Sequence, residues 1–532
     1  MLAATQLHLG IVSLEMDETS VSEKHLNKCK EIVDKCEDRS TISNVALNMF
    51  NQLGLLWSKR DGEKAREYLE EAEKFYRSLK ESDLTPVDPD DLFLSNAEGE
   101  HKARENFEKL HTLTLYYLAQ IHGAMGDSLR SSIYCHDTLR RQLECGDYDP
   151  IDWALNSASL SQFFTEKNAY GQARHHLAAS SCILDRYREE IDSSTEETEE
   201  NRSKRETLNH RSADVARCWA KYGLLLLTSS KERLLGDADD SPRPQPEAPT
   251  KSHELQNLYF PTLDIESYEL EVTDEFVLTL QDAHKVFSNI QSWLGKAHAY
   301  YTIDAFASDH IEIVEDQCQM YECLVFFEDN AENQAKLYKR GADLLENVVR
   351  RVNPVYYMQY CRKMWNHLGH IYTNIFELKM DRVREHDERP TQRAVAKINS
   401  LAAKATSSFR AFVDSFRSAD GELPRSVEEG AEKPFLQAHF HIAVLSSKYI
   451  TLDKGAQLAN CRKSLDAYLT IAEYCKENPR ASESVQMELG LVNEMVRLMP
   501  VKILKLQGEI AGSDVHVRSL KHDTTDAPRV HF

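Results

Sequence analysis

Few residues in this chain of 532 have the type and spacing that catalysis or metal binding requires. The sequence contains no GxxxxGK[ST] phosphate loop and no GxGxxG, GxSxG or HExxH motif. His367 and His370 would share one face of a helix, but no acidic or cysteine residue in register completes a metal site. We interpret the pair as histidines with structural partners or solvent contact, and predict a protein that is not an enzyme and uses no cofactor.

The helices that would carry functional residues recur in pairs. In a tetratricopeptide repeat the first helix of each hairpin carries W-x2-L-G-x2-Y, and the small residue after the leucine lets the two helices approach closely. The pattern is found at Leu53-Gly54, Leu118-Ala119, Leu160-Ser161 and Trp365-x2-Leu368-Gly369-x2-Tyr372. The intervals exceed those of a regular array, so we predict an all-α fold, an α-solenoid of degenerate tetratricopeptide-like helix hairpins.

The first helices of such a solenoid line a concave groove. Counting from each consensus leucine, polar and aromatic residues occupy the groove positions, among them Asn51, Tyr117, Gln120, Ser159 and Gln162. Amides, hydroxyls and aromatic rings are adaptable contacts for another protein's surface. Each residue alone is equally compatible with a hydrated helix face, but the set indicates a partner-binding groove.

Composition and charge limit the class of partner. With 19 glycines and 15 prolines the chain has few of the residues on which β-turns depend, which favours helix. The net charge of −22 disfavours nucleic acid and anionic membranes, and favours a basic protein surface. The 11 cysteines include no CxxC pair, and no apolar run is long enough to span a bilayer. We therefore expect reduced thiols, a cytoplasmic location and no membrane insertion.

Breaks in the helical periodicity predict the domain organisation. We expect an N-terminal helical half over 1–235 and a C-terminal helical half over 257–512. The acidic, serine- and threonine-rich stretch predicts a disordered insert at about 189–206, and four closely spaced prolines predict a flexible linker over 236–256. The polar residues 513–532 are expected to form a flexible tail.

Several long segments resemble one protein family. They include YYLAQ at Tyr116–Gln120, the block Tyr134–Phe164, DHIEIVEDQ at Asp309–Gln317 and FFEDNAE at Phe326–Glu332. From about Leu7 to about Leu506 the chain resembles the kinesin-binding protein family (KIF-binding protein). Relative to that family we expect a first helix and an acidic stretch to be absent at the start of the chain, and the linker is shorter and richer in proline.

The resemblance implies a function without catalysis. Members of the family are right-handed α-solenoids that bind the motor domains of selected kinesins and cover the surface with which the motor grips microtubules. It implies a cytoplasmic, cytoskeleton-associated regulator of kinesin-driven transport and microtubule organisation that binds no nucleotide of its own. The family's motor contacts map onto Tyr117, Gln120, Gln142 and Ser159, and Gln142 rests on the resemblance alone.

Two other functions stay open at this point. One is a general tetratricopeptide scaffold that binds a peptide of a cytoskeletal or mitochondrial partner, for which a narrow groove matched to one segment is expected. The other is an enzyme with an unrecognised site, which turnover or a bound metal in the purified protein would reveal.

Overall fold

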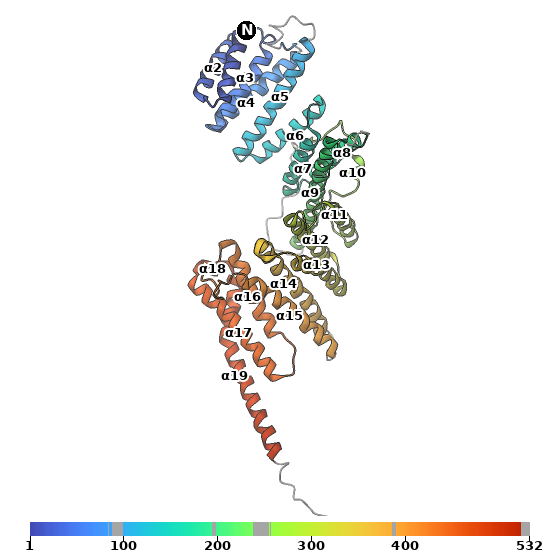
Figure 1. The fold of residues 1–532 in the computed structure, drawn as a ribbon, viewed down its shortest axis with the longest axis vertical. Helices are drawn as coiled ribbons and strands as arrows, with labels where there is room; N and C mark the ends of the chain where they lie inside the picture. The colour runs from blue at the N-terminus through green and yellow to red at the C-terminus, as the bar shows by residue number, and fades with distance from the viewer. Residues whose placement is uncertain are drawn as a thin grey trace, which may run out of the picture. The chain divides into compact units, whose positions relative to one another are not determined.

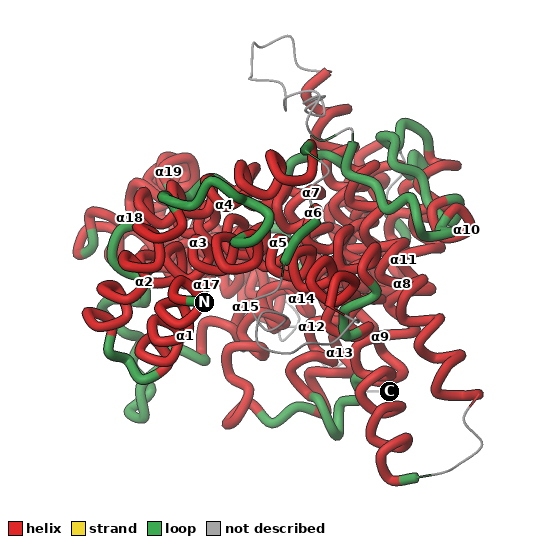
Figure 2. The backbone as a smooth tube through the Cα atoms, turned by 90° about the horizontal axis from the view of Figure 1, so that it is seen from above, coloured by secondary structure: helices red, strands yellow, loops and turns green. Residues whose placement is uncertain are grey.

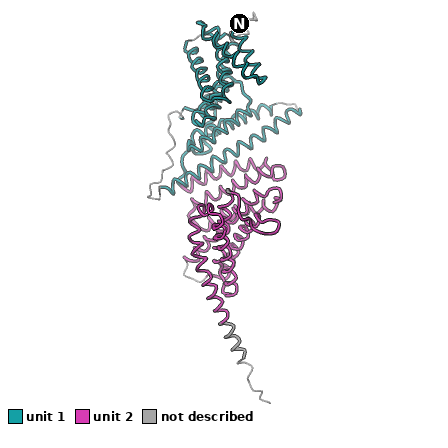
Figure 3. The backbone as a smooth tube through the Cα atoms, turned by 90° about the vertical axis from the view of Figure 1, so that its left-hand side faces the viewer, with its two compact units in different colours: residues 1–278 teal, residues 279–532 magenta. Residues whose placement is uncertain are grey.

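A computed structural model of the chain describes residues 1–82, 85–87, 99–193, 198–237, 255, 257–385 and 390–522. These residues form helices joined by turns and loops, and no strand is found among them (Figures 1 and 2). The chain divides into two compact units, Met1–Leu278 and Thr279–Phe532 (Figure 3).

Unit 1 is a series of helix hairpins. Its helices are α1 (Leu2–Glu15), α2 (Thr19–Val33), α3 (Ser43–Ser58), α4 (Gly62–Glu81), α5 (Gly99–Ala124), α6 (Ser128–Cys145), α7 (Pro150–Glu166), α8 (Tyr170–Ser193), α9 (Glu199–Asp237) and α10 (Glu266–Glu269). α1 packs on α2, α3 on α4, α5 on α6 and α7 on α8. The first helix of one hairpin also contacts the next, as α3 does with α5 and α7 with α9. This nearest-neighbour packing is that of a helical repeat protein.

Local sequence signals set the ends of these helices. The side chains of Asp61 and Asp149 accept hydrogen bonds from backbone N–H groups in the first turns of α4 and α7. Such caps satisfy donors that the helix itself leaves unpaired. α6 ends at Gly146, whose φ of 66° lies in the left-handed region that glycine adopts without strain.

Unit 2 is also built of helices that pack against their neighbours in the chain. Its helices are α11 (Leu280–Tyr300), α12 (Ala307–Phe327), α13 (Ala331–Arg351), α14 (Pro354–Glu385), α15 (Gln392–Asp414), α16 (Glu429–Ser447), α17 (Lys454–Glu477), α18 (Pro479–Ser484) and α19 (Gln486–His522). From α11 to α17 each helix packs against the next, and α17 packs against α19. The core combines aliphatic side chains with aromatic ones, including the fully buried Phe376, Phe409 and Phe435.

Close helix approach depends on the glycines of the repeat pattern. A Cβ atom added to Gly54 of α3 would lie 2.6 Å from Leu69 of α4, and one added to Gly369 of α14 would lie 2.6 Å from the ring of Phe409 on α15. Both distances are far below a van der Waals contact. Within each unit, the all-α fold of tetratricopeptide-like hairpins predicted from the sequence is confirmed.

The segment 257–278 returns to α8 and belongs to unit 1. Phe260 is buried among Trp153, His136 and His175, with ring centroids 4.6–5.5 Å away. The ring of His175 accepts a hydrogen bond from the backbone N–H of Phe260 at 2.9 Å and pairs with Glu269 at 2.8 Å. Unit 1 therefore extends to Leu278, beyond the predicted linker 236–256, most of which lies outside the described residues.

Parts of two segments that the sequence predicted to be disordered or flexible are helical in the structure. α8 continues to Ser193 and α9 begins at Glu199, so the predicted disordered insert at about 189–206 is helical at both its ends, and 194–197 lie outside the described residues. Thr198 explains this start, because its hydroxyl accepts a hydrogen bond from the backbone N–H of Asn201 at 3.2 Å. α19 likewise reaches His522, inside the predicted tail 513–532.

Candidate protein-binding site

Polar and aromatic side chains gather on the surface of α5. Tyr116 is 46% exposed, and the exposed Gln120 donates a hydrogen bond from Nε2 to its hydroxyl at 2.7 Å. The two residues meet because side chains four positions apart lie on one helix face. Tyr117 is half-buried against the small apolar cluster of Leu69, Leu118 and neighbours, and burial raises the pKa of its hydroxyl, which stays a neutral donor.

A hollow lined by α3, α4 and α5 contains two of the predicted residues. It has a volume of about 180 Å³, and Tyr117 and Gln120 line it together with Leu55 and Ser58 of α3. Leu55 is 37% exposed, so the hollow presents an apolar side chain beside polar ones. It has the mixed character of a pocket that receives a partner's side chain.

A second, larger hollow lies between α5, α6 and α7. Its volume is about 410 Å³, and Gln142 of α6 and Ser159 of α7 line it. Tyr116 also lines this second hollow, and its hydroxyl accepts a hydrogen bond from Gln120, which lines the first hollow. Tyr116 therefore links the two hollows. Tyr116 is not among the residues predicted from the sequence, although its four-residue spacing from Gln120 places both on one helix face.

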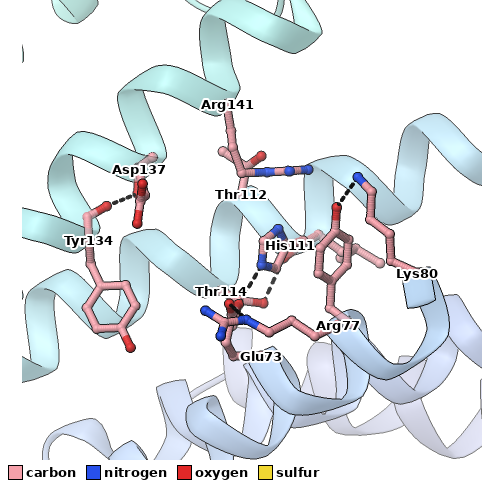
Figure 4. Close-up of polar contacts among 12 residues, drawn as sticks. Glu73, Arg77, Lys80, His111, Thr112, Thr114, Tyr134, Asp137 and Arg141 are labelled. Atoms are coloured by element: carbon pink, nitrogen blue, oxygen red, sulfur yellow. Dashed lines mark hydrogen bonds and ion pairs between the residues drawn. The ribbon is translucent and has the colours of Figure 1, made fainter. Parts of the chain in front are cut away.

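A network of polar side chains joins α4, α5 and α6, three of the helices that line the hollows (Figure 4). The carboxylate of Glu73 pairs with His111 of α5 and with Arg77 at 2.7 Å. Burial alone would raise the pKa of Glu73, but these hydrogen bonds hold it below its usual value. Burial lowers the pKa of His111, so its neutral ring donates to the carboxylate. Arg141 of α6, the residue before Gln142, pairs with Glu108 of α5.

Comparison with known proteins gives the family. Residues 151–506 match the family described as KIF-1 binding protein C terminal. Proteins named KIF-binding protein from Danio rerio and Homo sapiens are 35% and 33% identical to this chain, over 96% of it and over 84% and 85% of their own lengths. The chain belongs to the KIF-binding protein family. Because these alignments cover nearly the whole chain, both hollows lie in the region shared with KIF-binding proteins.

One solved structure is also similar in sequence. It is described as the cryo-EM structure of KIFBP core, and it matches 44% of this chain and 75% of its own, with 30% sequence identity and a TM-score of 0.31.

Two other predicted residues lie apart from the hollows. Gln162 of α7 is exposed and donates from Nε2 to Sγ of Cys218 on α9 at 3.5 Å. Asn51 is fully buried, and its amide bonds the carbonyl oxygen of Leu110 at 2.9 Å and the hydroxyl of Thr114 at 2.7 Å. The prediction that Asn51 borders a groove therefore does not hold, because α5 covers this face of α3.

The histidines considered for metal binding have protein partners instead. His367 contacts Glu315 at 2.9 Å and Glu322 at 3.0 Å, both on α12. Burial opposes its charged form, but the two carboxylates outweigh that effect and raise the pKa of His367 to about 9. In the described part of the chain, no group of three or more side chains is arranged to hold a metal ion, and no helix has the length and apolarity to cross a membrane.

Proposed function

We propose that this chain binds kinesin motor domains through the two linked hollows lined by α3 to α7, and thereby prevents the motor from attaching to microtubules. The observation that carries the proposal is the convergence of Tyr117 and Gln120 in one hollow and Gln142 and Ser159 in the next, with Tyr116 between them. The relatives' shared name, KIF-binding protein, supports kinesin as the partner.

The chemistry of the two hollows suits a folded protein partner. Each combines apolar walls, such as Leu55 in the first and Leu160 and Phe163 in the second, with amide and hydroxyl groups. Aromatic residues in such surroundings often supply most of an interface's binding energy. The residues that line the hollows come from five helices, α3 to α7, which favours a broad contact surface over one extended peptide.

Charge explains why a motor's track-binding face is the expected target. The outer face of a microtubule is acidic, so the surface with which a motor grips it must be basic. A protein of net charge −22 would attract that basic surface over long range and compete with the track for it. In this proposal the chain is a cytoplasmic, cytoskeleton-associated regulator that acts by steric competition and catalyses no reaction.

Microtubule co-sedimentation tests the proposal. A panel of purified kinesin motor domains would be pelleted with microtubules in the presence and absence of the chain, and we expect a subset of motors to remain in the supernatant. Gln142→Ala combined with Ser159→Ala should weaken this effect about tenfold or more. Thr207→Ala, an exposed position on α9 that lines neither hollow, is the matched control. If no motor is displaced, or if the double variant acts like the parent chain, the proposal fails.

A further inference from the structure

The last helix of unit 2 has apolar residues on two opposite faces. The inner face of α19 packs on α17 through Met499, Ile503 and Leu506, which are buried with Cys461 of α17. On the other side, Leu498, Val501 and Leu504 are 53%, 66% and 67% exposed. Single exposed apolar side chains are common on protein surfaces, but three at three-residue steps form a continuous stripe on one helix face.

Positive charge accompanies this stripe. Between 497 and 505 the sequence is RLMPVKILK, which contains Arg497, Lys502 and Lys505 and no acidic residue. All three cations are exposed. These nine residues therefore carry a net charge of +3, opposite in sign to the net charge of −22 of the whole chain. We call Leu498, Val501, Leu504 and these three cations the outer face of α19.

We infer that the outer face of α19 is a docking surface for an acidic amphipathic helix of a partner protein. In a stack of helices, an exposed apolar side of one helix has the character of a surface on which another helix packs. A helix with an apolar ridge would cover the stripe, and carboxylates along its flanks would pair with the cations. This surface belongs to unit 2, whereas the residues of the proposed kinesin site belong to unit 1.

Charge disfavours the other possible occupants. A second copy of the chain also carries a net charge of −22, so most of its surface would be repelled by the rest of this one. An anionic bilayer would repel the chain in the same way, and three apolar residues bury little area in it. A short acidic helix avoids both costs because it contacts only the local basic patch.

A display selection tests the inference without a known partner. The probe is a phage-displayed library of random 16-residue peptides, selected on the full chain and counter-selected on Leu498→Ser/Val501→Ser/Leu504→Ser. We expect the enriched peptides to carry Leu, Ile or Phe at three- and four-residue steps, flanked by Asp and Glu. A labelled consensus peptide should then bind with an affinity that falls as salt concentration rises.

Charge-reversal variants provide the matched comparison. Lys502→Glu combined with Lys505→Glu should weaken the consensus peptide about tenfold or more. Lys463→Glu combined with Lys476→Glu changes two exposed lysines of α17 and should leave binding unchanged. Circular dichroism of each variant checks that the helices remain folded.

Three results would overturn the inference. The first is a selection that yields no peptide dependent on the outer face, or only peptides without acidic residues. The second is binding of the chain to phosphatidylserine-containing vesicles that the Lys502/Lys505 variant loses. The third is self-association that the same variant abolishes, measured by analytical ultracentrifugation.

Discussion

The close approach of α14 and α15 at Gly369 gives a quantitative prediction for Gly369→Ala. The added methyl carbon would lie 2.6–2.7 Å from three atoms of the Phe409 ring. That ring is fully buried and has little freedom to retreat, because it stacks on His441 at 5.0 Å and meets the edge of His370 at 5.2 Å. The ring, the helix or both must therefore shift to accommodate the substitution.

Two opposing effects determine how far Gly369→Ala changes the free energy of unfolding. Overpacking a buried contact costs about 1–3 kcal/mol, and the rigid surroundings of Phe409 favour the upper part of that range. Replacing glycine by alanine inside a helix returns about 0.5–1 kcal/mol. We expect a net loss of about 2 kcal/mol for Gly369→Ala. Gly295→Ala in α11 is the matched control, since a Cβ atom there meets nothing within 4 Å and should stabilise the helix slightly.

Thermal unfolding followed by circular dichroism measures both variants. Their free energies of unfolding should differ by about 2–3 kcal/mol, which corresponds to melting temperatures about 5–10 °C apart for a unit of this size. Hydrogen exchange should locate the faster opening of Gly369→Ala in α14 and α15. Adding Phe409→Leu, a smaller side chain, should recover part of the loss. Equal melting temperatures for the two alanine variants would refute the reasoning.

Three further predictions concern the candidate site and a buried charge. Tyr116→Ala combined with Gln120→Ala removes only exposed groups, so the melting temperature should not change. We expect the dissociation rate of the kinesin complex, measured by surface plasmon resonance, to rise about tenfold or more. An unchanged dissociation rate would contradict the proposed site. Asn51→Ala removes two buried hydrogen bonds, so it should lower the free energy of unfolding by about 1–3 kcal/mol in denaturant titrations. The kinesin dissociation rate should stay the same, because Asn51 is fully buried. The pKa of His367 is about 9 in the folded protein and about 6.5 in the unfolded chain. The protonated ring therefore adds on the order of 3 kcal/mol to the free energy of unfolding below pH 6.5, and this contribution is lost as the pH rises through 9. His367→Gln should flatten the melting temperature between those pH values, and an unchanged slope would contradict this assignment.

Features encoded within one hairpin could be predicted from the sequence. The glycine at 54 follows the consensus leucine, and the structure shows why a side chain there would collide with Leu69. Tyr117 and Gln120 could be placed together because three-residue spacing puts both on one face of a helix. Helical periodicity therefore predicted the fold, and it predicted that Tyr117 and Gln120 lie on one side of their helix.

Features that depend on distant segments could not be predicted in this way. Asn51 bonds Thr114, which lies 63 residues further along, and nothing near Asn51 signals that α5 covers it. His367 finds Glu315 and Glu322 at separations of 52 and 45 residues, although no acidic residue lies in register on its own helix. Such contacts follow from the way successive hairpins stack, which a local pattern does not specify.

The return of residues 257–278 to α8 has a consequence for the order in which the protein forms during synthesis. Hairpins closed by neighbouring helices can fold as soon as their second helix has left the ribosome. His175 must wait for Glu269, which is made 94 residues later. Until then the aromatic pocket that receives Phe260 stays open, with Trp153 and His136 uncovered. The nascent N-terminal unit therefore passes through an unfinished stage with exposed apolar surface, and a chaperone that recognises such surface would bind it there.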